Sequence, residues 1–228
     1  MDYKLFYWDL PFRGNFVQLM LEEVGARYQR RHASEIYPEH GLAIHNPGMA
    51  PPYLYECRSQ TYFAQMPACL MHLGREYDRL PAPSELHTLA LKTILDCNDV
   101  LKEITNNNGL LMWQKEPWEQ FRSQRLRRWM QVFEHTGLAH GLKSGDGFLL
   151  GSQLSVADIA VTALFGTLLH CLPPLREDLL AAAPGIAGLC ERIEARPAIR
   201  TFLQKQRGEY GSRYCGGQIE DSLRQMLG

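Results

Sequence analysis

The sequence lacks the features that mark several large classes of protein. Its six cysteines are scattered without a CxxC pair, and its eight histidines show no metal-ligand spacing, so neither a disulfide framework nor a metal site is expected. No apolar run reaches the roughly 18 residues of a membrane span. No charged-then-apolar leader precedes Tyr3. We therefore expect a cytoplasmic protein with no membrane partner.

An excess of one charge is also missing. The chain of 228 residues carries 24 basic and 25 acidic residues, for a net charge of −1. Nucleic-acid binding requires a basic excess or patch, so nucleic acid is not expected as a partner. The arginines between 122 and 128 have a helical spacing that spreads them around a solvated face. An apolar content of 45% is typical of a globular protein.

The first part of the chain alternates between strand and helix patterns. Residues 3–8 are short and rich in aromatics, as in a buried strand. Residues 14–24 carry an apolar stripe at helical spacing, and Gly25 favours a stop after them. Residues 28–33 are a second strand candidate. A strand, helix and strand in this order predict a crossover with parallel pairing.

A hairpin and a helix are predicted next. Residues 53–55 and 62–63 read as strands around a polar turn, and Pro67 suits the first turn of the helix that follows. The hairpin therefore leads from a Pro-Pro corner to a helix N-terminus. Free backbone N–H groups at such a terminus favour an anion.

Strand signals end after the proline-rich stretch 80–84, which we interpret as a linker. It separates a small α/β domain at 1–79 from an all-helical domain at 85–228. The helices predicted in the second domain cover 85–104, 118–138, 159–169, 184–195 and a segment from Pro197. Ser155 to Asp158 reads as a capping box before the third of them. The glycine-rich tail 208–228 is left unassigned.

Several short motifs, taken in order, resemble the soluble glutathione transferases, in particular bacterial-like members of the tyrosine type. The motifs are Tyr7-Trp8 with Arg13-Gly14, the stretches 50–54 (APPYL) and 65–70 (QMPACL), the capping box, and 192–203 (RIEARPAIRTFL). Each is weak alone, but together they cover almost the whole chain. The resemblance implies a thioredoxin-like N-terminal domain followed by an all-helical one.

The same resemblance implies a chemistry and a catalytic residue. Tyr7 would donate a hydrogen bond to the sulfur of glutathione, which favours the thiolate and creates a nucleophile near neutral pH. The thiolate would attack small electrophiles or peroxides, as in detoxification. Glutathione is then a cosubstrate, no cofactor is covalently bound, and a homodimer is expected. Tyr7 also shares a strand face with Tyr3 and Leu5, so a purely structural aromatic is the alternative.

The resemblance also implies which residues would hold glutathione, at the positions of this sequence that match the family's motifs. Pro52 would be a cis proline, and Pro51 before it would pair with the ligand through its carbonyl alone, because proline has no N–H. Gln65 and Met66 would contact the ligand at the helix N-terminus. A Met66 side chain cannot donate the hydrogen bond that the serine or threonine usual there provides.

Charged and apolar candidates complete the predicted site. Arg13 would support the active-site lobe or the glutamyl end of glutathione, with a structural role as the alternative. Asp99, with Asp96 as its competitor, would hold the glutamyl ammonium or remain a solvated helix charge. An apolar cosubstrate pocket would include Phe12 and Trp113, with Trp118 as a further candidate, or these aromatics would be core.

A different class of function stays open. Pro51, Met66 and Asn15, which stands where the family often has a basic residue, each remove a polar contact with the ligand. They favour, as the alternative, a non-catalytic binding or regulatory protein with weak or no affinity for glutathione. His40 and His45 would face a carboxylate or simply be solvated.

Overall fold

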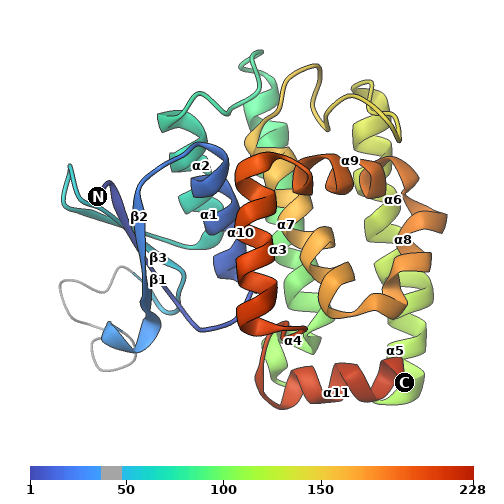
Figure 1. The fold of residues 1–228 in the computed structure, drawn as a ribbon. Coiled ribbons are helices and arrows are strands. Elements are labelled where there is room, and N and C mark those ends of the chain that lie inside the picture. Colours follow the sequence, from blue (N-terminus) through green and yellow to red (C-terminus); the bar gives the residue numbers. More distant parts are fainter. Residues whose placement is uncertain (37–47) are drawn as a thin grey trace.

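The computed structural model describes residues 1–36 and 48–228, and its first part is a small sheet with helices packed beside it (Figure 1). The strands are β1 (Tyr3–Tyr7), β2 (Tyr28–His32), β3 (Tyr53–Glu56) and β4 (Thr61–Ala64). Their order in the sheet is β2-β1-β3-β4. β1 is parallel to β2, whereas the pairs β1–β3 and β3–β4 are antiparallel. The predicted crossover and hairpin are thus confirmed.

Two helices and a short turn accompany these strands. α1 (Arg13–Glu23) joins β1 to β2 and buries the apolar stripe predicted for it. Gly25, which follows α1, has a φ of 66°, a backbone conformation that glycine adopts at no steric cost. The 3₁₀ turn η1 (Ala33–Glu35) follows β2, and α2 (Met66–Glu76) follows β4.

The second part is helical, and residues 80–84 lie between it and α2. Its elements are α3 (Leu86–Ile104), α4 (Asn106–Gly109), α5 (Lys115–Gln120), the π-helical η2 (Phe121–Leu126), α6 (Arg127–Ala139), α7 (Val156–Cys171), the 3₁₀ turn η3 (Pro173–Leu175), α8 (Arg176–Ala182), α9 (Pro184–Glu194), α10 (Pro197–Tyr210) and α11 (Gly217–Leu227). Extended pairing after β4, within the described residues, is limited to an isolated bridge between Phe148 and Gly151. Within residues 1–36 and 48–228, no helix has the length and apolar character needed to cross a membrane.

Two details of the helices go beyond the prediction. The segment 118–138, predicted as a single helix, is helical throughout, with the π-helical η2 between α5 and α6. The unassigned tail from 208 continues α10 to Tyr210 and then forms α11. The apolar residues Ile219, Leu223 and Met226 of α11 recur at helical spacing, so this helix has a local signal that the prediction did not use.

The capping box of α7 is confirmed. A carboxylate oxygen of Asp158 accepts hydrogen bonds from the backbone N–H and the hydroxyl of Ser155, each over 2.8 Å. The other oxygen accepts from the N–H of Leu149 over 2.7 Å. The carboxylate therefore fixes both the start of α7 and the loop before it.

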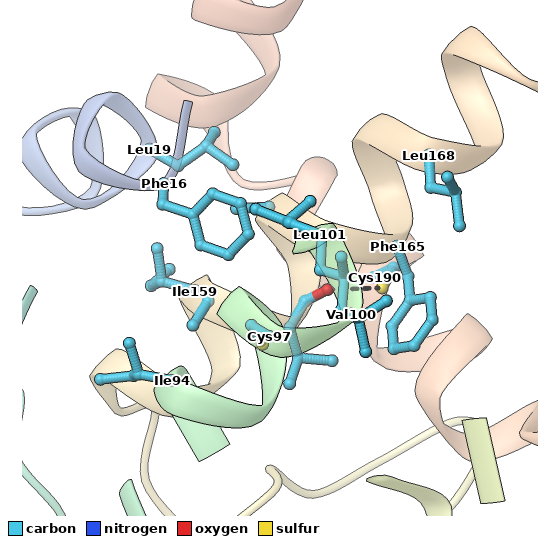
Figure 2. Packing of buried hydrophobic residues seen from close by; sticks show 14 of the residues in the cluster. Phe16, Leu19, Ile94, Cys97, Val100, Leu101, Ile159, Phe165, Leu168 and Cys190 are labelled. Carbon is cyan, nitrogen blue, oxygen red and sulfur yellow. Dashed lines mark hydrogen bonds between the residues drawn. The ribbon is translucent and has the colours of Figure 1, made fainter. Parts of the chain in front are cut away.

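One hydrophobic core joins the two parts of the chain. α7 is buried along nearly its whole length, and Figure 2 shows side chains of α1, α3, α7 and α9 meeting around it. Phe16 and Leu19 of α1 are 1% exposed and lie in the same cluster as Phe165. This packing fixes α1, and with it the end of β1, relative to the helical part.

Candidate functional site

The strand register brings three predicted site residues to one end of the sheet. Phe6 pairs with Tyr53, and Tyr53 pairs with Ala64. The next positions on these neighbouring strands are Tyr7, Pro52 and Gln65. Because adjacent strands lie about 4.8 Å apart, these three residues lie side by side. The peptide bond between Pro51 and Pro52 is cis, as predicted.

Tyr7 is held against the N-terminus of α1. The backbone N–H of Arg13 donates to its phenol oxygen over 3.0 Å. A Cβ at Gly14 would lie 2.3 Å from Cδ1 of the ring, so only glycine allows this close approach. Burial raises the pKa of Tyr7 to about 12, although the N–H groups of Arg13 and Gly14 and the Arg13 charge partly oppose the shift. The phenol is therefore neutral at physiological pH and keeps its proton.

Arg13 links the sheet part to the helical part. Its Nε donates to the side-chain oxygen of Asn98 on α3 over 3.2 Å, and Nη2 donates to that of Asn108 on α4 over 2.8 Å. The guanidinium carbon also lies 4.9 Å from the ring centre of Phe12. Among the described residues no carboxylate forms an ion pair with Arg13, so its partners are neutral amides. The half-buried charge can therefore attract an anion.

The start of α2 offers backbone donors rather than side-chain donors. Gln65 is exposed and has a φ of 67° and a ψ of 118°, an unusual backbone conformation for a residue other than glycine. Such a conformation costs about 1–3 kcal/mol and is typical of functional sites. Met66 turns into the core and is 1% exposed. The free N–H groups that follow Gln65 are what this corner presents to an anion.

The two acidic candidates on α3 differ in their surroundings. Asp99 is exposed, whereas Asp96 forms an ion pair with Lys92 over 2.5 Å. The residue of α3 that contacts the start of α1 is Asn98, through Arg13. Sequence reasoning missed Asn98 because an amide in a charged helix segment carries no distinctive pattern.

The predicted aromatic pair is divided between two places. Phe12 meets the ring of Tyr214 edge-on, with 5.2 Å between centroids. Trp113 packs against Trp118 and Phe121, with centroids 5.3 and 5.1 Å away. Trp113 also lines a cavity of about 340 Å³ beside α4, and Phe12 is not among the residues around that cavity. The structure therefore does not bring Phe12 and Trp113 together there.

The tail, which sequence reasoning left unassigned, packs onto the site. The carboxylate of Glu220 on α11 accepts from the backbone N–H groups of Tyr214 (2.9 Å), Cys215 (3.0 Å) and Gly216 (2.7 Å). It also pairs with Arg224. Tyr214 is only 1% exposed. We call residues 211–216 the tail loop, and its contact with Phe12 makes it a wall of the site.

Asn15 lies inside the molecule rather than at a ligand surface. It is 0% exposed, and its amide donates to the hydroxyl of Thr167 on α7 over 2.7 Å. Its oxygen accepts from the side-chain amide of Gln206 on α10 over 2.8 Å. Asn15 therefore completes a buried polar network between α1, α7 and α10. His40 and His45 lie outside the described residues.

Comparisons with known proteins agree with this architecture. The family model described as "Glutathione S-transferase, C-terminal domain" matches residues 89–226. The Pi-class glutathione S-transferase of Onchocerca volvulus has a similar structure, with a TM-score of 0.75, 18% identity, and coverage of 96% of this chain and 100% of that one. The glutathione S-transferase from Ascaris lumbricoides matches with a TM-score of 0.70 and 16% identity, and the match covers 90% of this chain and 98% of that one. NaGST-2 matches with a TM-score of 0.65 and 17% identity, and the match covers 89% of this chain and 96% of that one. No curated protein matches the chain.

Proposed function

The chain belongs to the glutathione S-transferase family, and on that premise we propose that it is an enzyme that activates the thiol of glutathione for attack on small electrophiles or peroxides. The observation that supports this most directly is the placement of the Tyr7 hydroxyl. It lies at the N-terminus of α1, and the backbone of Tyr7 is next to that of the cis proline in the register of β1 and β3.

Tyr7 is suited to donate a hydrogen bond. The N–H of Arg13 occupies one lone pair of the phenol oxygen, and the raised pKa of Tyr7 keeps the O–H proton in place. A glutathione sulfur next to this O–H would be stabilised as the thiolate, and its own proton would leave to water. A hydrogen bond to a charged group contributes about 1.5–3 kcal/mol. The thiolate then bonds to the electrophilic atom and displaces the leaving group.

Backbone groups and one cation would hold the peptide. The carbonyl of Pro51 and the amide of Gln65 offer polar contacts, and the N–H groups at the start of α2, from Met66 onward, offer an anion site. Arg13 would attract a carboxylate of glutathione, and Asp99 its ammonium. Phe12, beside the tail loop, would contact the apolar cosubstrate, and Trp113 would contact larger cosubstrates that extend towards α4.

A non-catalytic binding protein of the same family is the second candidate. Pro51 has no N–H for the ligand, and the Met66 side chain is turned into the core. Tyr7 is only 3% exposed, and the tail loop contacts Phe12 nearby. In this alternative the site would bind glutathione weakly or not at all.

We also propose that the protein acts in the cytoplasm as a homodimer, with a role in detoxification. The family membership supports this assembly. Sedimentation equilibrium should give twice the 26.1 kDa mass of one chain. A single species at the mass of one chain would contradict the dimer.

Calorimetry and a conjugation assay test the proposed function together. Glutathione is titrated into the wild type, Tyr7→Phe and Tyr3→Phe, and the turnover of a chlorodinitrobenzene electrophile is measured for each. Tyr3 is the matched control, because it lies on the same strand but donates to Glu56 over 3.3 Å. We expect binding in all three and a large loss of turnover in Tyr7→Phe alone. Absence of binding at millimolar glutathione would support the second candidate instead.

A further inference from the structure

A larger cavity, of about 900 Å³, lies between β2, α1 and α10. None of the residues proposed to bind glutathione lines it. Tyr28 and Arg30 alternate on β2 and so share one face, and Gln18 and Glu22 are four residues apart on α1. Figure 1 shows α10 alongside α1. The volume is in the range that holds small ligands, and we call this space the α10 cavity.

The direction of α10 shows which residues lie at each end of the α10 cavity. Arg196, just before α10, pairs with Glu23 over 2.7 Å. Tyr210, at the other end of α10, accepts a hydrogen bond from Arg30. α10 therefore runs from the neighbourhood of Glu22 towards Arg30, so one end of the cavity carries Glu22 and the other carries Arg30 together with Asp9 and Glu209.

The Glu22 end is rich in hydrogen-bond acceptors. Glu22 accepts from the hydroxyl of Tyr28 over 2.7 Å, and no cation in the described part of the chain pairs with it. Gln18 is 4% exposed, and its side-chain oxygen has no hydrogen-bond partner among those residues. The amide nitrogen of Gln18 lies 3.5 Å from the Tyr28 oxygen, a weak contact. Because the last torsion of a glutamine is broad, the amide can turn its oxygen towards a ligand.

The remaining walls favour an aromatic body and fix its orientation. Phe202 is half-buried and lines the cavity from α10. At the far end, the guanidinium carbon of Arg30 lies 5.1 Å from the ring centre of Tyr210. The Nη2 atom of Arg30 lies 3.8 Å from a carboxylate oxygen of Asp9. Lys205 also lines the cavity. The carboxylates at this end are Asp9, which is paired with Arg30, and Glu209, which is exposed, whereas Glu22 is half-buried, so a ligand cation gains more at the Glu22 end.

We propose that the α10 cavity is a binding site for a primary organic amine with an aromatic body. Its ammonium group lies between the Glu22 carboxylate and the side-chain oxygen of Gln18, and its ring lies against Phe202. The ammonium group supplies the donors that both oxygens lack, and the pairing with Glu22 is charge-assisted. The site is separate from the residues proposed for glutathione, so it does not depend on that function.

Calorimetric titration of phenethylamine into the full chain tests the proposal. The alcohol and the carboxylate of the same shape, 2-phenylethanol and 3-phenylpropionate, are titrated beside it. We expect saturable binding of the amine, with at least tenfold weaker binding of both analogues. Glu22→Gln removes the charge but keeps an acceptor for Tyr28, and it should weaken amine binding about tenfold. Glu209→Gln, at the other end of the same cavity, should leave it unchanged.

Other results would overturn the proposal. These are no saturable binding of phenethylamine, equal binding of the amine and the alcohol, or unchanged affinity in Glu22→Gln. Tyr7→Phe is included in the series, because a loss of amine binding in that variant would place the amine in the glutathione site. A second variant, Phe202→Ala, replaces a half-buried residue and should weaken the amine without unfolding the chain. Unchanged affinity in that variant would also contradict the assignment.

Discussion

The backbone N–H of Arg13 donates a hydrogen bond to the phenol oxygen of Tyr7 over 3.0 Å. This contact joins the end of β1 to the first residue of α1, and because the phenol oxygen is its acceptor, the O–H proton is not used in it. Burial keeps the pKa of Tyr7 near 12, so the phenol carries its proton across the physiological range. The proposed activation of glutathione depends on this geometry.

Gly14→Ala should disrupt the geometry directly. The new Cβ would lie 2.3 Å from the Tyr7 ring, so either the ring or the start of α1 must move. Overpacking of this kind costs about 1–3 kcal/mol, and turnover should fall with stability. Urea unfolding and the conjugation assay measure the two effects. Gly208→Ala is the control, because nothing lies within 4 Å of its Cβ position in α10, and it should be neutral or stabilising.

Asn15→Ala should reduce stability without changing the affinity for glutathione. The substitution leaves the buried Thr167 hydroxyl and the Gln206 amide without their partner. An unsatisfied buried polar group costs about 1–3 kcal/mol. Urea unfolding measures the loss, and calorimetry with glutathione is the second readout. A change in affinity with unchanged stability would mean that Asn15 acts at the ligand site after all.

The contact of Glu220 with the tail loop should depend on pH. Burial by itself raises the pKa of Glu220, but the hydrogen bonds from Arg224 and from the N–H groups of Gly216 and Tyr214 outweigh it and lower the pKa. The stabilisation is therefore complete above the unfolded value of about 4.3. It is lost as the pH falls below that value and through the lower pKa of the folded state.

Hydrogen exchange of 211–227 between pH 6 and pH 3 measures this contact. Protection of the tail loop should drop in acid before that of α7 does. Glu220→Gln should show weaker protection already at pH 6 and no separate step in acid. An acid step of the same size in Glu220→Gln would assign the pH dependence to another group.

The elements that sequence reasoning predicted well are those with local signals. Ser155 and Asp158 are three residues apart, and their contact follows from the capping pattern alone. The hairpin of β3 and β4 has its own turn, and the register of the sheet then brings Tyr7, Pro52 and Gln65 together. Local patterns therefore predicted the strands, whereas the choice of Tyr7, Pro52 and Gln65 as candidate site residues came from the family resemblance.

The parts of the site that were missed depend on long-range polar contacts. Arg13 reaches Asn98 and Asn108, which are 85 and 95 residues away in the sequence. Asn15 and Gln206 are separated by 191 residues. Asparagine and glutamine have no periodic signature in a single sequence, so nothing indicated these partners. The tail loop also has long-range partners, because the Cys171 thiol and a ring nitrogen of His170 contact the backbone carbonyls of Arg213 and Gly211.

The most direct test of the central claim is the pH titration of enzyme-bound glutathione by the ultraviolet absorbance of its thiolate. An unperturbed thiol has a pKa of about 8.5. In the wild type and in Tyr3→Phe, we predict a midpoint at least about one unit lower, since a hydrogen bond to a charged group is worth about 1.5–3 kcal/mol. In Tyr7→Phe, the midpoint should return towards the unperturbed value while glutathione stays bound. An unperturbed midpoint in the wild type, or the same lowered midpoint in Tyr7→Phe, would contradict the role of Tyr7.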